Sequence, residues 1–315
     1  MNSSLGPRLN PSAPIVCFGY ISPGVVFLVE QYPEANGGAY VLEKRPFIGA
    51  DCTMAAQTLA GWQVPVHLIG NAMGDDFRGR DALAALHAAR VQTHILLQAG
   101  LRTTDEVDIS DRAGTRTFFV EHNPAVWDTL LTADLHAIDQ AGLLYVDWYV
   151  GPAVNRAMDY ARARQVPIYL NVEYSLSDPA RYLDLISAAT FVQARLSDKN
   201  RSAEDPIALG RAIMKAGPQL VLITRGRHGA LLFAPDGSIV DIAPPPIESV
   251  DTQGAGAAFA AAAMYALRAG WPAEHIARFA TTAASVKCER FGLLSASVEA
   301  IIQRMQAAGL DVSAN

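Results

Sequence analysis

The sequence predicts an α/β protein that has a central, mainly parallel sheet covered by helices and a second, smaller β-sheet. Short apolar runs of strand length alternate with alanine-rich helical segments along most of the chain, which is typical of a parallel sheet. Segments with polar–apolar alternation interrupt that order, which indicates strands with one solvated face. The chain has 315 residues, 50% of them hydrophobic and 18% charged, so it can bury a large core.

The strands expected in the main sheet are short and almost wholly apolar. They lie at Pro14–Phe18, Val66–Ile69, Leu143–Asp147, Ile168–Asn171, Thr190–Gln193 and Leu220–Thr224. Helices are expected between and after these strands, where apolar residues recur at helical spacing. They lie at Thr53–Ala60, Arg78–Ala89, Val154–Arg164, Ile207–Ala216 and Ala258–Ala269.

The smaller sheet is expected from two insertions, at about residues 38–48 and 102–122. Its strands are predicted at Tyr40–Phe47, Thr104–Ile109 and Thr115–Glu121, the last two joined by a turn at Asp111–Gly114. We expect an antiparallel sheet outside the main body. Near a ligand cleft it would act as a lid, and its exposed apolar face would suit a homodimer.

Composition excludes several classes of protein. The net charge is −6 and no stretch gathers Lys and Arg, which argues against a nucleic-acid surface. Cys17, Cys52 and Cys288 are widely spaced, so neither a metal site nor a disulfide framework is expected, and a reducing cytoplasm fits best. Residues 1–13 are predicted to be a disordered leader before a single domain over 14–315. No apolar run approaches the length of a membrane span.

The segment Asp251–Ala257, with the sequence DTQGAGA, leads directly into the helical run Ala258–Ala269. A glycine-rich turn at a helix N-terminus directs backbone N–H groups at an anion, and the helix dipole adds positive potential. The expected donors are the N–H groups of Gly254, Ala255, Gly256 and Ala257. This pattern predicts a phosphate-binding turn.

Two other segments carry glycines at informative positions. They are Gly70–Gly79, with the sequence GNAMGDDFRG, and Thr224–Gly229, with the sequence TRGRHG. In this order the three motifs resemble those of the PfkB, or ribokinase-like, family of carbohydrate kinases over about Pro14–Leu310. The resemblance implies a three-layer sandwich with a β-sheet lid, in which ATP and Mg²⁺ serve the phosphorylation of a sugar or nucleoside hydroxyl. On the nucleotide side it implies roles for Thr224, Gly226, Gly229, Asp251 and Thr252.

The chain departs from the family pattern on the substrate side. Ala257 stands where the family has the aspartate that acts as general base, and Gly24 stands where it has a substrate-binding aspartate. The family's G-G-x-x-x-N motif becomes Gly49-Ala50-Asp51-Cys52-Thr53-Met54, and residues 192–197 lack the Asn/Glu pair of its N-x-x-E motif. Loss of a general base costs a rate factor of roughly 10² to 10⁴. The backbone donors for phosphate remain.

Three interpretations follow from these departures. In the first, the chain is an ATP-dependent kinase in which another group, such as Asp51 or Glu173, replaces the missing base. In the second, it is a non-catalytic protein that binds a nucleotide or a sugar-like ligand. In the third, Ala257 is an engineered substitution, although Gly24 and Met54 count against a single designed change. The substrate itself is not predicted, because the residues that would define it are those that differ.

Overall fold

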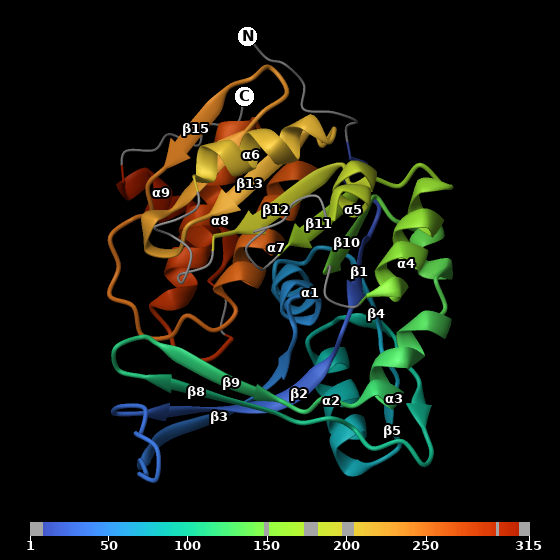
Figure 1. Cartoon of the computed structure of the whole chain (residues 1–315), viewed down its shortest axis with the longest axis vertical. Helices are drawn as coiled ribbons and strands as arrows, with labels where there is room; N and C mark the ends of the chain where they lie inside the picture. The colour runs from blue at the N-terminus through green and yellow to red at the C-terminus, as the bar shows by residue number, and fades with distance from the viewer. Residues whose placement is uncertain (1–8, 148–150, 173–181, 197–204, 294–295, 309–315) are drawn as a thin grey trace.

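The computed structural model describes residues 9–147, 151–172, 182–196, 205–293 and 296–308. In these residues the main sheet has nine strands in the order β15-β14-β13-β12-β11-β10-β1-β4-β6 (Figure 1). The strands are β1 (Ile15–Gly19), β4 (Val66–Gly70), β6 (Gln92–His94), β10 (Leu143–Asp147), β11 (Ile168–Val172), β12 (Phe191–Arg195), β13 (Leu220–Thr224), β14 (Ala230–Phe233) and β15 (Ile239–Ile242). From β13 to β6 in this order, every pair of neighbouring strands is parallel. At the other edge, β14 is antiparallel to β13, and β15 is antiparallel to β14.

Helices cover both faces of the sheet, so the predicted α/β fold with a central, mainly parallel sheet is confirmed. The α-helices are α1 (Asp51–Gly61), α2 (Phe77–Ala88), α3 (Pro124–Trp127), α4 (Pro152–Arg162), α5 (Leu183–Ala188), α6 (Pro206–Lys215), α7 (Ala255–Arg268), α8 (Ala273–Cys288) and α9 (Val298–Ala307). One apolar core lies between the sheet and α1, α2, α7, α8 and α9, and a second lies between the sheet and α3 to α6. Two cores on opposite faces make a three-layer sandwich.

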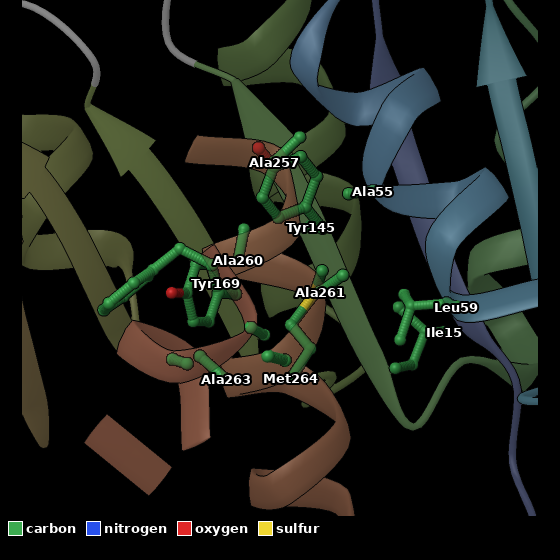
Figure 2. Packing of buried hydrophobic residues seen from close by; sticks show 14 of the residues in the cluster. Ile15, Ala55, Leu59, Tyr145, Tyr169, Ala257, Ala260, Ala261, Ala263 and Met264 are labelled. Carbon is green, nitrogen blue, oxygen red and sulfur yellow. The ribbon is translucent and has the colours of Figure 1, made fainter. Parts of the chain in front are cut away.

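Helix α7 is central to the first core because its side chains are small. Ala260, Ala261 and Ala263 are fully buried, and Figure 2 shows them near Tyr145 and Tyr169 of the sheet. Alanine at these positions lets the helix approach the sheet and its neighbours α1 and α8 closely. The close packing holds the N-terminus of α7 firmly at one edge of the sheet.

The lid is a separate sheet of four strands in the order β3-β2-β8-β9. Its strands are β2 (Ser22–Val29), β3 (Val41–Gly49), β8 (Glu106–Asp111) and β9 (Arg116–Val120). The expectation of a purely antiparallel sheet was wrong, because β2 was not predicted and it pairs in parallel with β8. Strand β2 follows β1 after only two residues and begins with Ser22, Pro23 and Gly24, which are residues typical of a turn, so the sequence did not indicate a strand there.

A two-stranded sheet formed by β5 (Met73–Gly74) and β7 (Leu97–Gln98) completes the described β-structure. Residues 1–8 of the predicted leader lie outside the described residues, whereas the side chain of Leu9 is buried in the first core.

Candidate functional site

The turn before α7 has the geometry of an anion site. Gly254 caps the helix in the left-handed conformation, with φ 70° and ψ 7°, which glycine adopts without strain. The N–H groups of Gly256 and Ala257 make no hydrogen bond to any residue that the structure describes. The N–H of Ala255, also predicted as a donor, instead donates to the carbonyl of Thr252 at 3.2 Å. The helix therefore presents at least two unused donors at its positive end.

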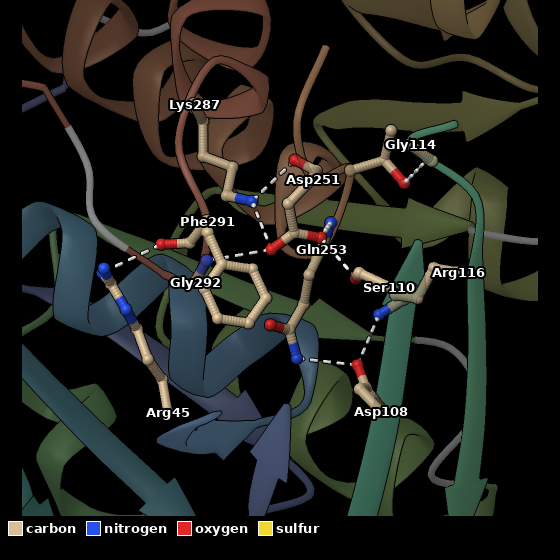
Figure 3. A network of polar contacts seen from close by, with 11 residues as sticks. Arg45, Asp108, Ser110, Gly114, Arg116, Asp251, Gln253, Lys287, Phe291 and Gly292 are labelled. Atoms are coloured by element: carbon tan, nitrogen blue, oxygen red, sulfur yellow. Dashed lines mark hydrogen bonds and ion pairs between the residues drawn. The ribbon is translucent and has the colours of Figure 1, made fainter. Parts of the chain in front are cut away.

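Asp251 holds this turn in place and is fully buried. Its carboxylate accepts hydrogen bonds from Ser110 Oγ at 2.8 Å, from the N–H of Gln253 at 3.0 Å and from the N–H of Gly292 at 2.9 Å (Figure 3). Lys287 Nζ lies 3.5 Å from Oδ2 of this carboxylate. A carboxylate with so many partners is a structural anchor of the turn.

Lys287 ties the end of α8 to the same turn. Its side chain is 3% exposed, and Nζ donates to the carbonyl oxygen of Asp251 at 2.9 Å. Burial lowers the pKa of this ammonium group, and the neighbouring Asp251 works in the opposite direction. Truncating either partner would leave a buried charge without compensation.

Ala257, which stands where the family has its general base, is 1% exposed and belongs to the first apolar core. Its methyl group can neither accept a proton nor hold a substrate hydroxyl.

The other predicted nucleotide residues lie at the same edge of the main sheet. Thr224 ends β13 and pairs with Arg195 of β12. Gln193, two residues earlier on β12, donates to the carbonyl of Gly256 at 3.3 Å. Strand β12 thus links the Thr224–Gly229 turn to the turn before α7. Gly229 has φ 77°, and a Cβ there would lie 1.9 Å from the carbonyl oxygen of Ile242, so only glycine fits.

Arg225, at the centre of the Thr224–Gly226 turn, is paired with Asp241 of β15. Thr252 is exposed and its hydroxyl donates to the carbonyl of Gly114 in the lid at 3.4 Å. Both residues therefore contribute to contacts within the protein.

The predicted substrate residues form two groups. Met54 lies beside the phosphate turn, since a Cβ on Gly254 would be 3.3 Å from its sulfur. Gly24 of β2 is paired with Glu106 of the lid strand β8, and Gly49, at the end of β3, lies beside the Glu106 carboxyl group. Ala50 caps α1 with φ 68° and ψ 145°, a backbone conformation that favours glycine. Asp51 begins α1, is 8% exposed and accepts a hydrogen bond from Asn171 Nδ2 at 3.0 Å.

The segment Gly70–Gly79 anchors the lid. Asp76 caps α2 by accepting from the N–H of Gly79 at 2.8 Å, and it also accepts from the N–H and hydroxyl of Thr103, each at 2.9 Å. A Cβ on Gly79 would lie 2.2 Å from the carbonyl oxygen of Gly74, which explains both glycines as close-packing positions. Thr103 lies three residues before the lid strand β8.

A polar group on the lid was not predicted from the sequence. Glu106, Asp108 and Ser110 of β8 are buried and alternate with the half-buried Val107 and Ile109. Asp108 accepts hydrogen bonds from Gln253 Nε2 at 2.7 Å and from Arg116 Nη1 at 3.1 Å (Figure 3). The alternation itself was visible, but it does not tell which face of the strand is covered.

A cavity of about 290 Å³ lies between α1, the start of α7 and the end of α8. Of the predicted site residues only Met54 and Gly254 line it, and neither Ala257 nor Thr224 does. We therefore assign it no ligand. Glu173, the second candidate for a replacement base, lies outside the described residues. No cluster of three or more His, Cys, Asp or Glu side chains suited to a metal ion occurs in the described part of the chain.

The comparison with known protein families decides the classification. Residues 49–300 match the pfkB family of carbohydrate kinases. The chain belongs to the pfkB family. A ribokinase from Bacillus subtilis (strain 168) is 27% identical to this pfkB-family chain over 249 residues, covering 78% of this chain and 81% of that protein.

Solved structures show the same fold. A candidate ribokinase from Agrobacterium tumefaciens has a TM-score of 0.84 and 21% identity, covering 95% of this pfkB-family chain and 100% of that chain. The ribokinase of Arabidopsis thaliana, solved with ribose and ATP, has a TM-score of 0.71 and 17% identity, covering 94% and 99% of the two chains. Among the helices that the structure describes, none combines the length and apolar character needed to cross a bilayer.

Proposed function

We propose that this pfkB-family chain binds ATP at the turn Asp251–Ala257 and slowly transfers the terminal phosphoryl group to a hydroxyl of a sugar or nucleoside. The observation that carries this proposal is the unused N–H pair of Gly256 and Ala257 behind the left-handed Gly254. Such donors at the start of a long helix suit a phosphate group. The similarity to ribokinases, one of them solved with ribose and ATP, supports the same assignment.

Magnesium would accompany the nucleotide. When bound, Mg²⁺ neutralises charge on the transferred phosphoryl group. Since the described residues offer no cluster of carboxylates for a metal, we expect phosphate oxygens and water to supply most of its ligands.

Slow transfer follows from Ala257. The turn can position the phosphates, but no carboxylate at this position can take the proton from the attacking hydroxyl. Positioning and electrostatic stabilisation remain, while the contribution of a general base, roughly 10² to 10⁴ in rate, is absent. Asp51 stays a candidate for a replacement base.

A second candidate function is a non-catalytic protein that binds a nucleotide or a sugar. The observation that favours it is the burial of Ala257 in the apolar core, at 1% exposure. Under this proposal, position 257, where a base would stand, is part of the apolar core instead.

The two candidates are separated by two measurements on the full chain. ATP with Mg²⁺ should raise the thermal midpoint under both, whereas only a kinase forms ADP in response to added sugars or nucleosides. For a kinase we expect Ala257→Asp to raise the rate of ADP formation, by up to about 10²-fold.

Ala258→Asp is the matched control, since it places the same charge at the next position of α7. It should not raise the rate. The absence of any thermal shift with ATP would contradict both candidates, and ATP binding without ADP formation in either chain would favour the binding protein.

We also propose a cytoplasmic location. Cys17, Cys52 and Cys288 are all buried as free thiols, which suits a reducing compartment.

A further inference from the structure

The inner face of the lid strand β8 carries acidic groups where the phosphate turn and the substrate side meet. The pattern of burial places Glu106, Asp108 and Ser110 on this face, with exposures of 8%, 0% and 0%. Ser110 and Asp108 contact Asp251 and Gln253 of the turn, as Figure 3 shows. Glu106 lies on the same face two residues before Asp108, so it is farther along β8 from the contacts that Ser110 and Asp108 make with the turn.

Glu106 lies beside both substrate-side glycines, with its backbone and Cβ at Gly24 and its carboxyl group at Gly49. Gly24 pairs with Glu106 across β2 and β8, and a Cβ on Gly24 would be 2.5 Å from the Glu106 carbonyl oxygen and 2.9 Å from its Cβ. A Cβ on Gly49 would be 2.7 Å from Glu106 Oε2. Glycine at both positions is therefore what lets β8 and the Glu106 side chain come so close.

This arrangement replaces one carboxyl group with another. The Cβ of an aspartate at position 24 would collide with the backbone of β8, whereas Glu106 of that neighbouring strand brings a carboxyl group beside Gly49. The carboxyl group absent from β2 is thus supplied by the neighbouring lid strand β8.

The carboxyl groups of Glu106 and Asp108 are hydrogen-bonded to each other, so they share a proton when Glu106 is protonated. Beside Asp108, Gln253 Oε1 accepts no hydrogen bond within the described residues, although Gln253 is fully buried. Unsatisfied buried acceptors are costly, so a ligand that carries several hydrogen-bond donors would be stabilised here. Hydroxyl groups of a polyol are such donors.

The protonation of Glu106 suits a hydroxyl partner. Burial, followed by the charge of Asp108, raises its pKa to about 8. A carboxyl that keeps its proton near neutral pH can donate one hydrogen bond and accept another, as a hydroxyl also does.

We propose that Glu106 binds a hydroxyl group of a neutral, polyhydroxylated substrate from the lid, in place of the carboxylate that is absent at Gly24. Asp108 and Gln253 continue this acceptor surface toward the phosphate turn. The inference rests on the proposed function, since it requires a sugar-type ligand under the lid.

The test compares four full-length proteins: the unchanged chain, Glu106→Ala, Glu106→Gln and Glu43→Gln. Glu43 is the matched control because it is also a lid carboxylate, half-buried and paired with Arg45. The thermal midpoint of each is followed while D-ribose, D-fructose or adenosine is titrated, with and without ATP and Mg²⁺. Because Glu106→Gln keeps a donor and an acceptor of similar size, it guards against loss of binding through misfolding.

We expect at least one probe to raise the midpoint of the unchanged chain and of Glu43→Gln equally. Glu106→Ala should lower the affinity for that probe by about tenfold or more, equivalent to about 1.4 kcal/mol, and Glu106→Gln should lower the affinity less. The midpoint shift caused by ATP should be the same in all four proteins.

Equal probe affinity in the unchanged chain and Glu106→Ala would overturn the inference, as would an equal loss in Glu43→Gln. A chain that responds to ATP but to none of the probes would overturn it too, while the nucleotide half of the proposed function stands. A chain that responds to a probe through Glu106 but not to ATP would support this inference and contradict the kinase.

Discussion

At the scale of single residues, the acid pair Glu106 and Asp108 is the least usual feature of the protein. The two carboxyl groups face the positively charged Arg116 of β9, which pairs with Asp108, and Tyr20 lies near Glu106. Burial raises the pKa of both acids, and each responds to the other. Such pairs cost folding free energy when both groups ionise, and they are found where a site needs them.

The pH dependence of stability should report this cost. The pKa of Glu106 is about 8 in the folded chain against 4.5 ordinarily, so the folded chain keeps a proton that the unfolded chain releases between these values. The stabilisation that this group contributes is therefore fully present below about pH 4.5, and it is lost as the pH rises through about 8.

Glu106→Gln, which never ionises, should be more stable than the unchanged chain above about pH 8, by up to a few kcal/mol, and the difference should shrink toward about pH 5. Urea denaturation at several pH values measures it. A difference independent of pH would contradict the expected ionisation.

At the scale of elements, the lid is fastened at both ends. Asp76 and Thr103 hold the segment that leads into β8. Beyond it, Ser110 and Gly114 are hydrogen-bonded to Asp251 and Thr252, and Arg45 donates to the carbonyl of Phe291. The inner apolar residues Val26, Leu28 and Phe47 pack on Phe291. In this arrangement the lid lies down on the phosphate turn.

Removing the hydrogen bonds between Asp76 and Thr103 should loosen the lid without disrupting the core of the main sheet. Asp76→Ala takes away a helix cap and two bonds to Thr103, so we expect a loss of about 1–3 kcal/mol in the free energy of unfolding. Faster hydrogen exchange in residues 103–111 should accompany it. Asp75→Ala is the control, because Asp75 is exposed and pairs only with Arg80 on the surface. Equal effects of the two changes would show that Asp76 is no anchor.

At the scale of the whole molecule, the lid presents apolar side chains to solvent. On its edge strands and the residue before β3, Tyr40, Val41, Leu42, Phe118, Phe119 and Val120 are all exposed, Tyr40 at 92% and Phe119 at 55%. Val41 and Leu42 lie on β3, whereas Phe118, Phe119 and Val120 lie on β9, so the two groups are at opposite edges of the lid sheet. Exposed apolar side chains on an unpaired edge strand such as β9 suit an interface. We propose that two copies of the chain pair through their lids.

Phe119→Asp should then shift the protein from dimer to monomer, since a carboxylate in an apolar interface is costly. Sedimentation velocity at several protein concentrations measures this. Leu183→Asp, an exposed leucine on α5 away from the lid, should leave the association state unchanged (Figure 1). A protein that sediments as a monomer before any substitution would refute the pairing.

The sequence alone determined six of the nine described strands of the main sheet, and it missed β6, β14 and β15. The predicted strands Leu143–Asp147 and Leu220–Thr224 have the bounds observed for β10 and β13, because strands buried on both faces read as unbroken apolar runs. It also indicated the glycine turn that begins α7, since the turn and the helix are contiguous in the chain, whereas phosphate binding there stays a prediction. Strand β2 was not predicted because it begins with Ser22, Pro23 and Gly24, which are residues typical of a turn.

Only the tertiary structure decided what stands at the substrate side. From the sequence, Gly24 was a lost carboxylate and Glu106 an ordinary lid residue. The parallel pairing of β2 with β8 brings them together and turns the glycine into the space that Glu106 occupies. The motif Gly70–Gly79 likewise became a lid anchor once Asp76 was seen beside Thr103. Local patterns encode backbone conformation, whereas contacts between distant segments depend on strand order and register, which no local pattern carries.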